Sequence, residues 1–156
     1  MPTVKEILAK KGNQVHTISH DKTVFEAVAL MNEKNIGALI VTHQEEGQDK
    51  VCGIISERDY LRHIVLKGRT SRKTPIQEIM TKKVIYSEPD CTVEKVLNIM
   101  TGKRIRHLPI MEKNQLVGLI SIGDCVRTVI KLQGVEIKYL KQYIADTYPG
   151  PAHDDT

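Results

Sequence analysis

One half-domain occurs twice in this chain, and this duplication constrains the fold more than any other feature. The stretch Thr23–Met31 recurs as Thr92–Met100, and Gly53–Asp59 recurs as Gly118–Asp124. Both copies of the second stretch contain the pattern Gly-x-x-Ser-x-x-Asp. A duplicated unit predicts a two-fold object with clefts between equivalent surfaces. The repeated pattern would then give that object two similar polar sites.

Composition limits the size of the core and the class of partner. The chain has 156 residues, of which 40% are hydrophobic, so one compact core or one intimate pair of repeats is expected. It contains one Phe, five Tyr and no Trp, so the core must be aliphatic and platforms for stacking bases are scarce. The net charge of +4 is low for a dedicated nucleic-acid protein, but it suits a small anionic ligand.

The cysteines and the terminal segments bear on location. Cys52, Cys91 and Cys125 are odd in number and far apart, so neither a disulfide framework nor a zinc site is predicted. Free thiols are typical of a reducing compartment. The sequence shows no apolar run of membrane-spanning length and no signal-peptide core. We therefore expect a cytoplasmic protein without membrane contact, or a protein of an organellar matrix if a transit peptide has been removed.

Hydrophobic periodicity predicts the same order of elements in each half: strand, helix, strand, strand, helix, which is an α+β arrangement. The helices that begin at Val24 and Val93 place apolar residues at i, i+3, i+4 and i+7. Thr23 and Glu26 form a capping-box pattern, whereas Thr92 must cap its helix alone. The predicted division is repeat 1 at 3–67, a linker at 68–75, repeat 2 at 76–133, a C-terminal amphipathic helix at 134–148 and a loose tail at 149–156.

The Ser-x-x-Asp pattern has two physical interpretations. Between a strand and a helix it is what a helix N-terminus requires for capping, and one copy alone would favour that interpretation. Two copies in the same context also suggest binding, because a helix N-terminus attracts anions and an Asp one turn later accepts hydrogen bonds from a ribose diol. The preceding glycine would let a ligand approach the backbone. Capping and binding can coexist.

The stretch Lys103–Pro109 is the most cationic part of the second repeat, at the end of a helix and the start of a strand. Cations at a helix C-terminus are favourable in themselves. Three cations and a histidine in five residues also suggest a phosphate clamp formed by Arg106 and His107. Repeat 1 has the uncharged Gly37 and Ala38 at the matching place, small enough for a flat base to lie against the backbone. The repeats would then divide the ligand between them.

These motifs carry a resemblance to a known family. Gly-Ile-Ile-Ser-Glu-Arg-Asp and Gly-Leu-Ile-Ser-Ile-Gly-Asp, together with Ile-Arg-His-Leu-Pro-Ile and Ile79-Met80-Thr81, resemble tandem cystathionine-β-synthase (CBS) domains over residues 3–132. The likeness is close to small stand-alone bacterial and organellar members. It implies two β-α-β-β-α repeats in a pseudo-two-fold pair, the Bateman module, with sheets packed between helices. It also implies a homodimer.

The resemblance implies clefts that bind an adenine nucleotide, with AMP the leading candidate and ADP, ATP, NAD(H) or S-adenosylmethionine the others. Asp59 and Asp124 would hold ribose hydroxyls, and Ser56 and Ser121 would contact ribose or phosphate. The remaining implied site residues are the phosphate ligands Arg106 and His107, Arg58 in the other cleft, the base contacts Gly37 and Ala38, the backbone contacts and apolar walls of Gln14, Val15, His16, Val84, Ile85 and Tyr86, and Pro109 of the cationic stretch.

The leading functional hypothesis is therefore a non-catalytic nucleotide sensor that signals through an unknown effector protein. No activated nucleophile, general-base pair or metal-ligand spacing is legible, which disfavours a nucleotide-processing enzyme and predicts no metal. Nucleic-acid binding through the basic stretches 67–73 and 82–83 is a weaker alternative. So is a plain assembly module that uses the apolar stripe predicted between Ile137 and Tyr148.

Overall fold

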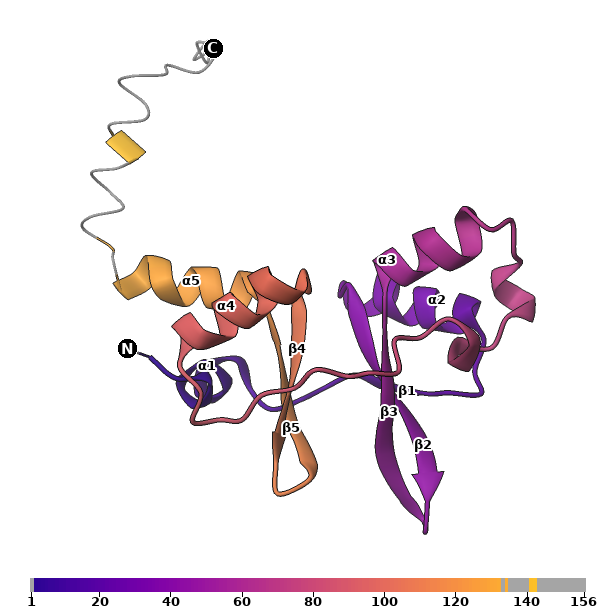
Figure 1. Cartoon of the computed structure of the whole chain (residues 1–156), viewed down its shortest axis with the longest axis horizontal. Coiled ribbons are helices and arrows are strands. Elements are labelled where there is room, and N and C mark those ends of the chain that lie inside the picture. Colours follow the sequence, from indigo (N-terminus) through magenta and orange to yellow (C-terminus); the bar gives the residue numbers. More distant parts are fainter. Residues whose placement is uncertain (1, 133, 135–140, 143–156) are drawn as a thin grey trace.

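The computed structural model of the chain describes residues 2–132, 134, 141 and 142. They form two lobes, each built on a small sheet with helices packed on it (Figure 1). The first sheet has the order β1-β2-β3, with β1 parallel to β2 and β2 antiparallel to β3; the second is the antiparallel pair β4-β5. The strands are β1 (Thr17–Ser19), β2 (Ala38–Glu45), β3 (Gln48–Ser56), β4 (His107–Glu112) and β5 (Gln115–Ser121).

The helices repeat in the same order, although their lengths differ between the lobes. The α-helices are α1 (Val4–Lys11), α2 (Val24–Lys34), α3 (Glu57–Tyr60), α4 (Val93–Lys103) and α5 (Ile122–Leu132). Three short turns complete the set: the π-helical η1 (Leu61–Val65) and the 3₁₀-helical η2 (Ser71–Lys73) and η3 (Ile76–Glu78).

Local capping fixes where the equivalent helices α2 and α4 begin. The Thr23 side chain accepts from the Glu26 amide, and the Glu26 carboxylate accepts from the Thr23 amide at 2.8 Å, which completes the predicted capping box. Thr92 accepts from the Lys95 amide at 3.2 Å and caps α4 without a returning acid, as predicted. Each cap satisfies helix donors that would otherwise have no partner.

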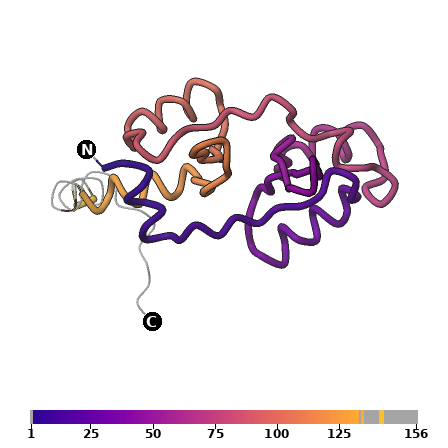
Figure 2. The backbone as a smooth tube through the Cα atoms, turned by 90° about the horizontal axis from the view of Figure 1, so that it is seen from below, coloured from indigo at the N-terminus to yellow at the C-terminus, as the bar shows by residue number. Residues whose placement is uncertain are grey.

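The two lobes exchange their leading segments. Val4, Ile7 and Leu8 of α1 stand at the start of the first repeat, yet they are buried in the core of the second lobe. Ile76 and Ile79, at the start of the second repeat, are buried in the core of the first lobe. The chain therefore crosses between the lobes twice, and Figure 2 shows the two crossings on opposite sides of the molecule. Each buried side chain contributes about 1.5–3 kcal/mol, so each lobe depends on a segment that enters from the other.

Backbone hydrogen bonds repeat this exchange in both lobes. Val4 donates to Cys91 O and Val93 donates to Pro2 O, each at 2.9 Å. In the other lobe Ile76 donates to Lys22 O and Val24 donates to Thr74 O, each at 2.8 Å. The same reciprocal pair therefore joins each leading segment to the start of the helix it covers.

The repeated glycine has a packing role in place of the ligand approach expected from sequence. A Cβ added to Gly118 would lie 2.5 Å from Leu8 Cδ2, and one added to Gly53 would lie 2.6 Å from Met80 Sδ. Both glycines are buried, and each lets the exchanged segment press against the second strand of the hairpin. The expectation that they admit a ligand is therefore wrong for this face of the strands.

Three local features differ from the sequence expectation or lie beyond it. The extended segment expected at 84–87 makes only an isolated bridge, Ser87 to Ile110, so the second sheet has no full strand equivalent to β1. The helix expected after Ser56 is α3 continued by the π-helical η1, and it ends before Gly68, which has φ +64° as a C′ glycine requires. The predicted helix 134–148 and tail 149–156 lie outside the described residues, apart from residues 134, 141 and 142.

Gly118→Ala should destabilise the fold, because the new methyl group would overlap the buried Leu8 side chain and force α1 away from β5. We expect a loss of about 1–3 kcal/mol in the free energy of unfolding, measured by urea denaturation. Gly102→Ala is the matched control: its added Cβ meets nothing within 4 Å inside α4, so it should be neutral or stabilising. Equal stability of Gly118→Ala and the parent chain would contradict this packing role.

Candidate functional site

The two Ser-x-x-Asp patterns form matching strand-to-helix junctions. At the first, the Ser56 amide donates to Asp59 Oδ2 at 2.9 Å, and the Asp59 amide donates back to Ser56 Oγ at 3.4 Å. At the second, the Ser121 amide donates to Asp124 Oδ2 at 2.8 Å, and the Asp124 amide donates to Ser121 Oγ at 3.2 Å. The pattern therefore caps both helices, and each carboxylate is held within one turn of a helix N-terminus.

Sheet register places the start of the preceding strand beside each junction. Ala38 pairs with Ser56 across β2 and β3, and His107 pairs with Ser121 across β4 and β5. The residue before each strand closes the contact: Gly37 O accepts from the Glu57 amide at 3.1 Å, and Arg106 O accepts from the Ile122 amide at 2.8 Å. Residues far apart in sequence are thus brought together in both repeats.

The two strand starts also meet each other across the pseudo-two-fold. The position of a Cβ on Gly37 lies 3.6 Å from His107 Cε1 and 3.1 Å from Glu57 Oε1. A side chain at position 37 would therefore press on both groups. The absent side chain of Gly37 leaves the imidazole of one repeat next to the backbone of the other.

His107 stands among charges from both repeats. Burial lowers the pKa of His107 below its usual value, and Lys11 and Arg106 lower it further, while Glu57 and Asp124 oppose them. The imidazole is therefore neutral near pH 7 and can donate one hydrogen bond while accepting another. Because an anion beside it would favour the protonated form, His107 suits a phosphate ligand.

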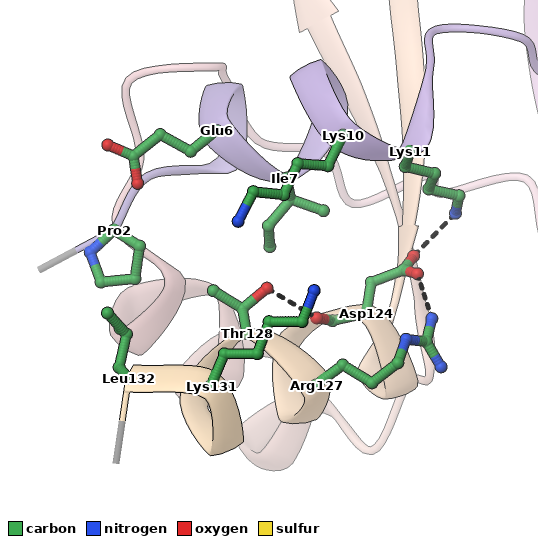
Figure 3. Close-up of a pocket in the computed structure, with 10 residues that line it drawn as sticks. All are labelled: Pro2, Glu6, Ile7, Lys10, Lys11, Asp124, Arg127, Thr128, Lys131 and Leu132. Carbon is green, nitrogen blue, oxygen red and sulfur yellow. Dashed lines mark hydrogen bonds and ion pairs between the residues drawn. The ribbon is translucent and has the colours of Figure 1, made fainter. Parts of the chain in front are cut away.

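Asp124 is paired to cations from two elements. Its side chain is 7% exposed; Lys11 Nζ donates to Oδ2 at 2.7 Å and Arg127 Nη2 donates to Oδ1 at 2.5 Å. Figure 3 shows Lys11 reaching down from α1 and Arg127 reaching up from α5. Burial opposes ionisation, but the hydrogen bonds from Lys11 and the Ser121 amide outweigh it and hold the pKa of Asp124 below its usual value. The carboxylate is ionised and already neutralised.

Asp59 has a different environment. It accepts only from the amide and hydroxyl of Ser56, both at Oδ2, and within residues 2–132 no ion pair reaches it. Its Oδ1 atom accepts no hydrogen bond from the described part of the chain. The first junction therefore presents an unpaired carboxylate oxygen, whereas the second does not.

Two pockets contain residues predicted for the site. One, of about 320 Å³, lies between α1 and α5 and includes Asp124; Lys10 and Lys131 extend into it (Figure 3). The other, of about 450 Å³, lies between α2 and α3 and includes Gly37, Glu57 and Tyr60. Both volumes suit a small ligand or part of one.

The remaining predicted residues lie along the two crossings and the strand starts. His16 O accepts from the Ile40 amide at 3.4 Å, so this crossing borders the first sheet. Pro109 is buried, and its carbonyl accepts from the Ser87 amide at 3.0 Å, which places the second crossing beside β4. Val15, Val84 and Ile85 are half-buried, whereas Gln14, Arg58, Tyr86 and Arg106 are exposed.

Sequence reasoning missed three charged residues at these junctions: Lys11, Glu57 and Arg127. Arg127 could have been found, because it lies at i+3 from Asp124 on a predicted helix and faces the same side. Glu57 lies inside the quoted motif. Lys11 gave no usable signal, since nothing local indicates that the first helix packs on the second repeat.

Other chemistry finds little support in the described residues. Burial, together with the charge of Asp124, raises the pKa of the Cys125 thiol to about 11, so Cys125 is not a thiolate near pH 7. Across residues 2–132, 134 and 141–142 no three His, Cys, Asp or Glu side chains cluster as metal ligands would. Within those residues no helix has both the length and the apolar character needed to cross a membrane.

A family model described as the CBS domain matches the chain twice, over residues 4–66 and 76–131. The chain belongs to the CBS-domain proteins. The mitochondrial CBS domain-containing protein CBSX3 of Arabidopsis thaliana is 38% identical over 152 residues, which cover 94% of this chain and 73% of the relative. A protein with CBS domains from Burkholderia ambifaria is 43% identical with a TM-score of 0.77, covering 83% of this chain and 94% of that one.

A second similar structure is the hexameric CBS-CP12 protein from bloom-forming cyanobacteria, which is 28% identical with a TM-score of 0.71 and covers 94% of this chain and 88% of that one. These matches confirm the predicted α+β pair of CBS repeats. A CBS pair is a regulatory module of a kind that typically binds adenine ligands, and CBS-domain proteins often oligomerise. Stand-alone members are generally non-catalytic.

The lowered pKa of His107 predicts a pH effect on stability. The unfolded chain, with His107 at its ordinary pKa of about 6.5, takes up a proton before the folded chain does, so stability should fall as the pH drops from about 7 to 5. His107→Gln removes this proton uptake, and its free energy of unfolding should decline less over the same interval. Urea denaturation at several pH values measures both.

His63→Gln is the control for this measurement, because His63 is exposed on η1, away from the junctions. Its free energy of unfolding should fall with pH as steeply as that of the parent chain. A His107→Gln variant whose stability falls as steeply as that of His63→Gln would show that His107 is not the responsible group.

Proposed function

We propose that this chain is a non-catalytic adenine-nucleotide sensor in which ligand bound between the repeats biases their arrangement. One observation supports it most: the two junctions present Asp59 and Asp124 at equivalent places, while Gly37 of one repeat lies against His107 of the other. Such a cleft offers carboxylates for a ribose, a small residue beside a flat base, and cationic groups for phosphate. AMP is the smallest of the candidate ligands that contains all three parts.

In this proposal each predicted residue has a role set by its position. Asp59 and Asp124 accept hydrogen bonds from ribose hydroxyls, while Ser56 and Ser121 orient them through the caps. His107 faces the phosphate. Arg106 contacts the phosphate in the same cleft, and Arg58 does so in the other cleft. Gly37 and Ala38 border the base. Backbone contacts and apolar walls come from the crossings at 14–16 and 84–86 and from Pro109.

The module can act as a sensor because ligand would touch both lobes at once. A ligand shifts an equilibrium only by its difference in affinity for the two arrangements. The exchanged segments make the lobes interdependent, so a ligand between them can bias how tightly α1 and η3 pack. Any output passes through a partner, and we propose an effector protein as that partner.

Calorimetry with AMP tests the proposal on the intact chain. We expect AMP to bind, and Asp59→Ala and Asp124→Ala each to weaken binding in their own cleft by about 10- to 100-fold, because each removes a charged hydrogen-bond acceptor. Glu26→Ala is the matched control: Glu26 occupies the same capping-box position as the two aspartates, but on α2. It should reduce stability without changing the dissociation constant.

Two results would reject the sensor hypothesis. One is the absence of binding heat with AMP, ADP, ATP, NAD(H) and S-adenosylmethionine. The other is an equal loss of affinity in Glu26→Ala and the two aspartate variants, since that would make the carboxylates structural only. Turnover of a bound nucleotide would instead favour an enzyme, and binding to nucleic acid with steep salt dependence would favour the basic stretches.

We also propose a homodimer that forms through the second helix of each repeat. Leu61 and Val65 on η1 and Val126 and Ile130 on α5 stand at the same distances after their motif serines, and all four are 40–53% exposed. Two apolar stripes related by the pseudo-two-fold can be covered together by a second copy of the chain. The hexameric state of the cyanobacterial relative supports association in this family.

The double variant Val65→Glu, Ile130→Glu should be monomeric, because it places a charge in each stripe, whereas the parent chain should be dimeric by light scattering after size-exclusion chromatography. Leu66→Glu is the control: Leu66 is 78% exposed, but its counterpart in the second repeat is Lys131, so it lies off the paired stripes. A dimer that survives the double variant would place the contact elsewhere.

The name of the Arabidopsis relative places that protein in the mitochondrion. For this chain we propose the cytoplasm or an organellar matrix. Three free cysteines, Cys52, Cys91 and Cys125, support a reducing compartment of either kind.

A further inference from the structure

The Asp124 carboxylate has little capacity left for a sugar. An ionised carboxylate offers about four acceptor positions, and three are used by the Ser121 amide, Lys11 and Arg127. A vicinal diol requires two. The Asp59 carboxylate, by contrast, keeps its Oδ1 atom entirely free of partners among the described residues. The two carboxylates therefore differ in the acceptor positions left for a ligand, although their motifs are the same.

Two of the three partners are side chains that can leave: Arg127 is 68% exposed and Lys11 is 38% exposed. Lys11 extends from the last turn of α1, and its Nζ atom divides its bonds between Asp124 Oδ2 and Leu119 O, each at 2.7 Å. The Ser121 amide is fixed by the backbone of the cap. Lys11 also lies within electrostatic reach of His107, where the proposed phosphate site begins. One short movement of its flexible chain would exchange a carboxylate for a phosphate.

The corresponding lysine of the other cleft makes no such bond. Leu8 packs on Gly118 as Met80 packs on Gly53, and Lys11 and Lys83 each follow three residues later in the sequence, although Lys11 ends α1 and Lys83 lies in non-helical chain after η3. Lys83 is exposed, and within residues 2–132 it forms no ion pair with Asp59. Lys83 therefore serves as an internal control for the effect of Lys11 on its aspartate.

We propose that Lys11 determines the ligand specificity of the Asp124 cleft: it occupies the carboxylate in the free protein and transfers to the phosphate of an incoming nucleotide, so this cleft excludes unphosphorylated nucleosides. Without a phosphate, freeing Asp124 would leave the Lys11 ammonium without its anionic partner, which is unfavourable beside a buried carboxylate. With a phosphate, a charge-assisted hydrogen bond replaces the one that is lost. The Asp59 cleft has no such requirement. This inference rests on the proposed nucleotide site.

The experiment uses the full chain carrying Asp59→Ala, which leaves only the Asp124 cleft, and measures dissociation constants for AMP and adenosine by calorimetry. We expect AMP to bind at least about tenfold more tightly than adenosine. Adding Lys11→Met should weaken AMP binding and strengthen adenosine binding. The ratio of the adenosine to the AMP dissociation constant should therefore fall by about tenfold, a change of about 1.4 kcal/mol in relative binding free energy. Methionine keeps the helix propensity and the apolar stem of lysine, so α1 should remain folded.

Lys83→Met in the same background is the control, and its AMP-to-adenosine ratio should stay unchanged. A purely structural role of Lys11 would weaken the binding of AMP and of adenosine by the same factor, and that result would overturn the inference. An unchanged ratio of dissociation constants in Lys11→Met, or an equal fall of that ratio in Lys83→Met, would also overturn it. Each of these leaves the nucleotide site itself intact. Failure of the parent chain to bind AMP at all would instead reject the proposed function, and this inference with it.

Discussion

The exchange of leading segments is the constraint on which the rest of the structure depends. Neither repeat completes its own core: the second needs Val4, Ile7 and Leu8 from the start of the chain, and the first needs Ile76 and Ile79 from the segment after η2. Burying those side chains forces two crossings between the lobes. The crossings hold the two junctions in a fixed relation, so Gly37 and His107 meet. The contact between the two junctions is thus a consequence of how the cores are filled.

The same exchange explains why two nearly identical motifs are electrostatically unequal. Because α1 packs on the second repeat, its final lysine arrives beside Asp124 and binds it, together with Arg127 from α5. The segment that packs on the first repeat is the short turn η3, and Lys83, at the matching position in the sequence, does not pair with Asp59. Sequence duplication therefore produces similar geometry with different charge.

In the proposed site, helix capping and ligand recognition would use the same carboxylates. The Ser-x-x-Asp pattern satisfies the helix donors at both junctions, and this alone would account for its presence. The first carboxylate has an oxygen with no partner among the described residues, whereas the second is held by the partly exposed side chains of Lys11 and Arg127. The repeated glycine is a counterexample: what looked like room for a ligand is filled by Leu8 and Met80. A motif residue can serve packing even when its neighbours serve binding.

The sequence by itself determined the repeat, the caps at Thr23 and Thr92 and most of the order of elements, because these depend on local periodicity and short-range hydrogen bonds; the strand expected at 84–87 was wrong. Its motifs carried the resemblance to the family, and with that resemblance they pointed to residues at the junctions, including His107 and both aspartates. The tertiary structure decided which lobe each leading segment covers, why Gly53 and Gly118 lack side chains, and that Lys11 neutralises Asp124 whereas Lys83 forms no ion pair with Asp59. Those outcomes are contacts between residues separated by most of the chain, and only the packing of a shared core brings such residues together.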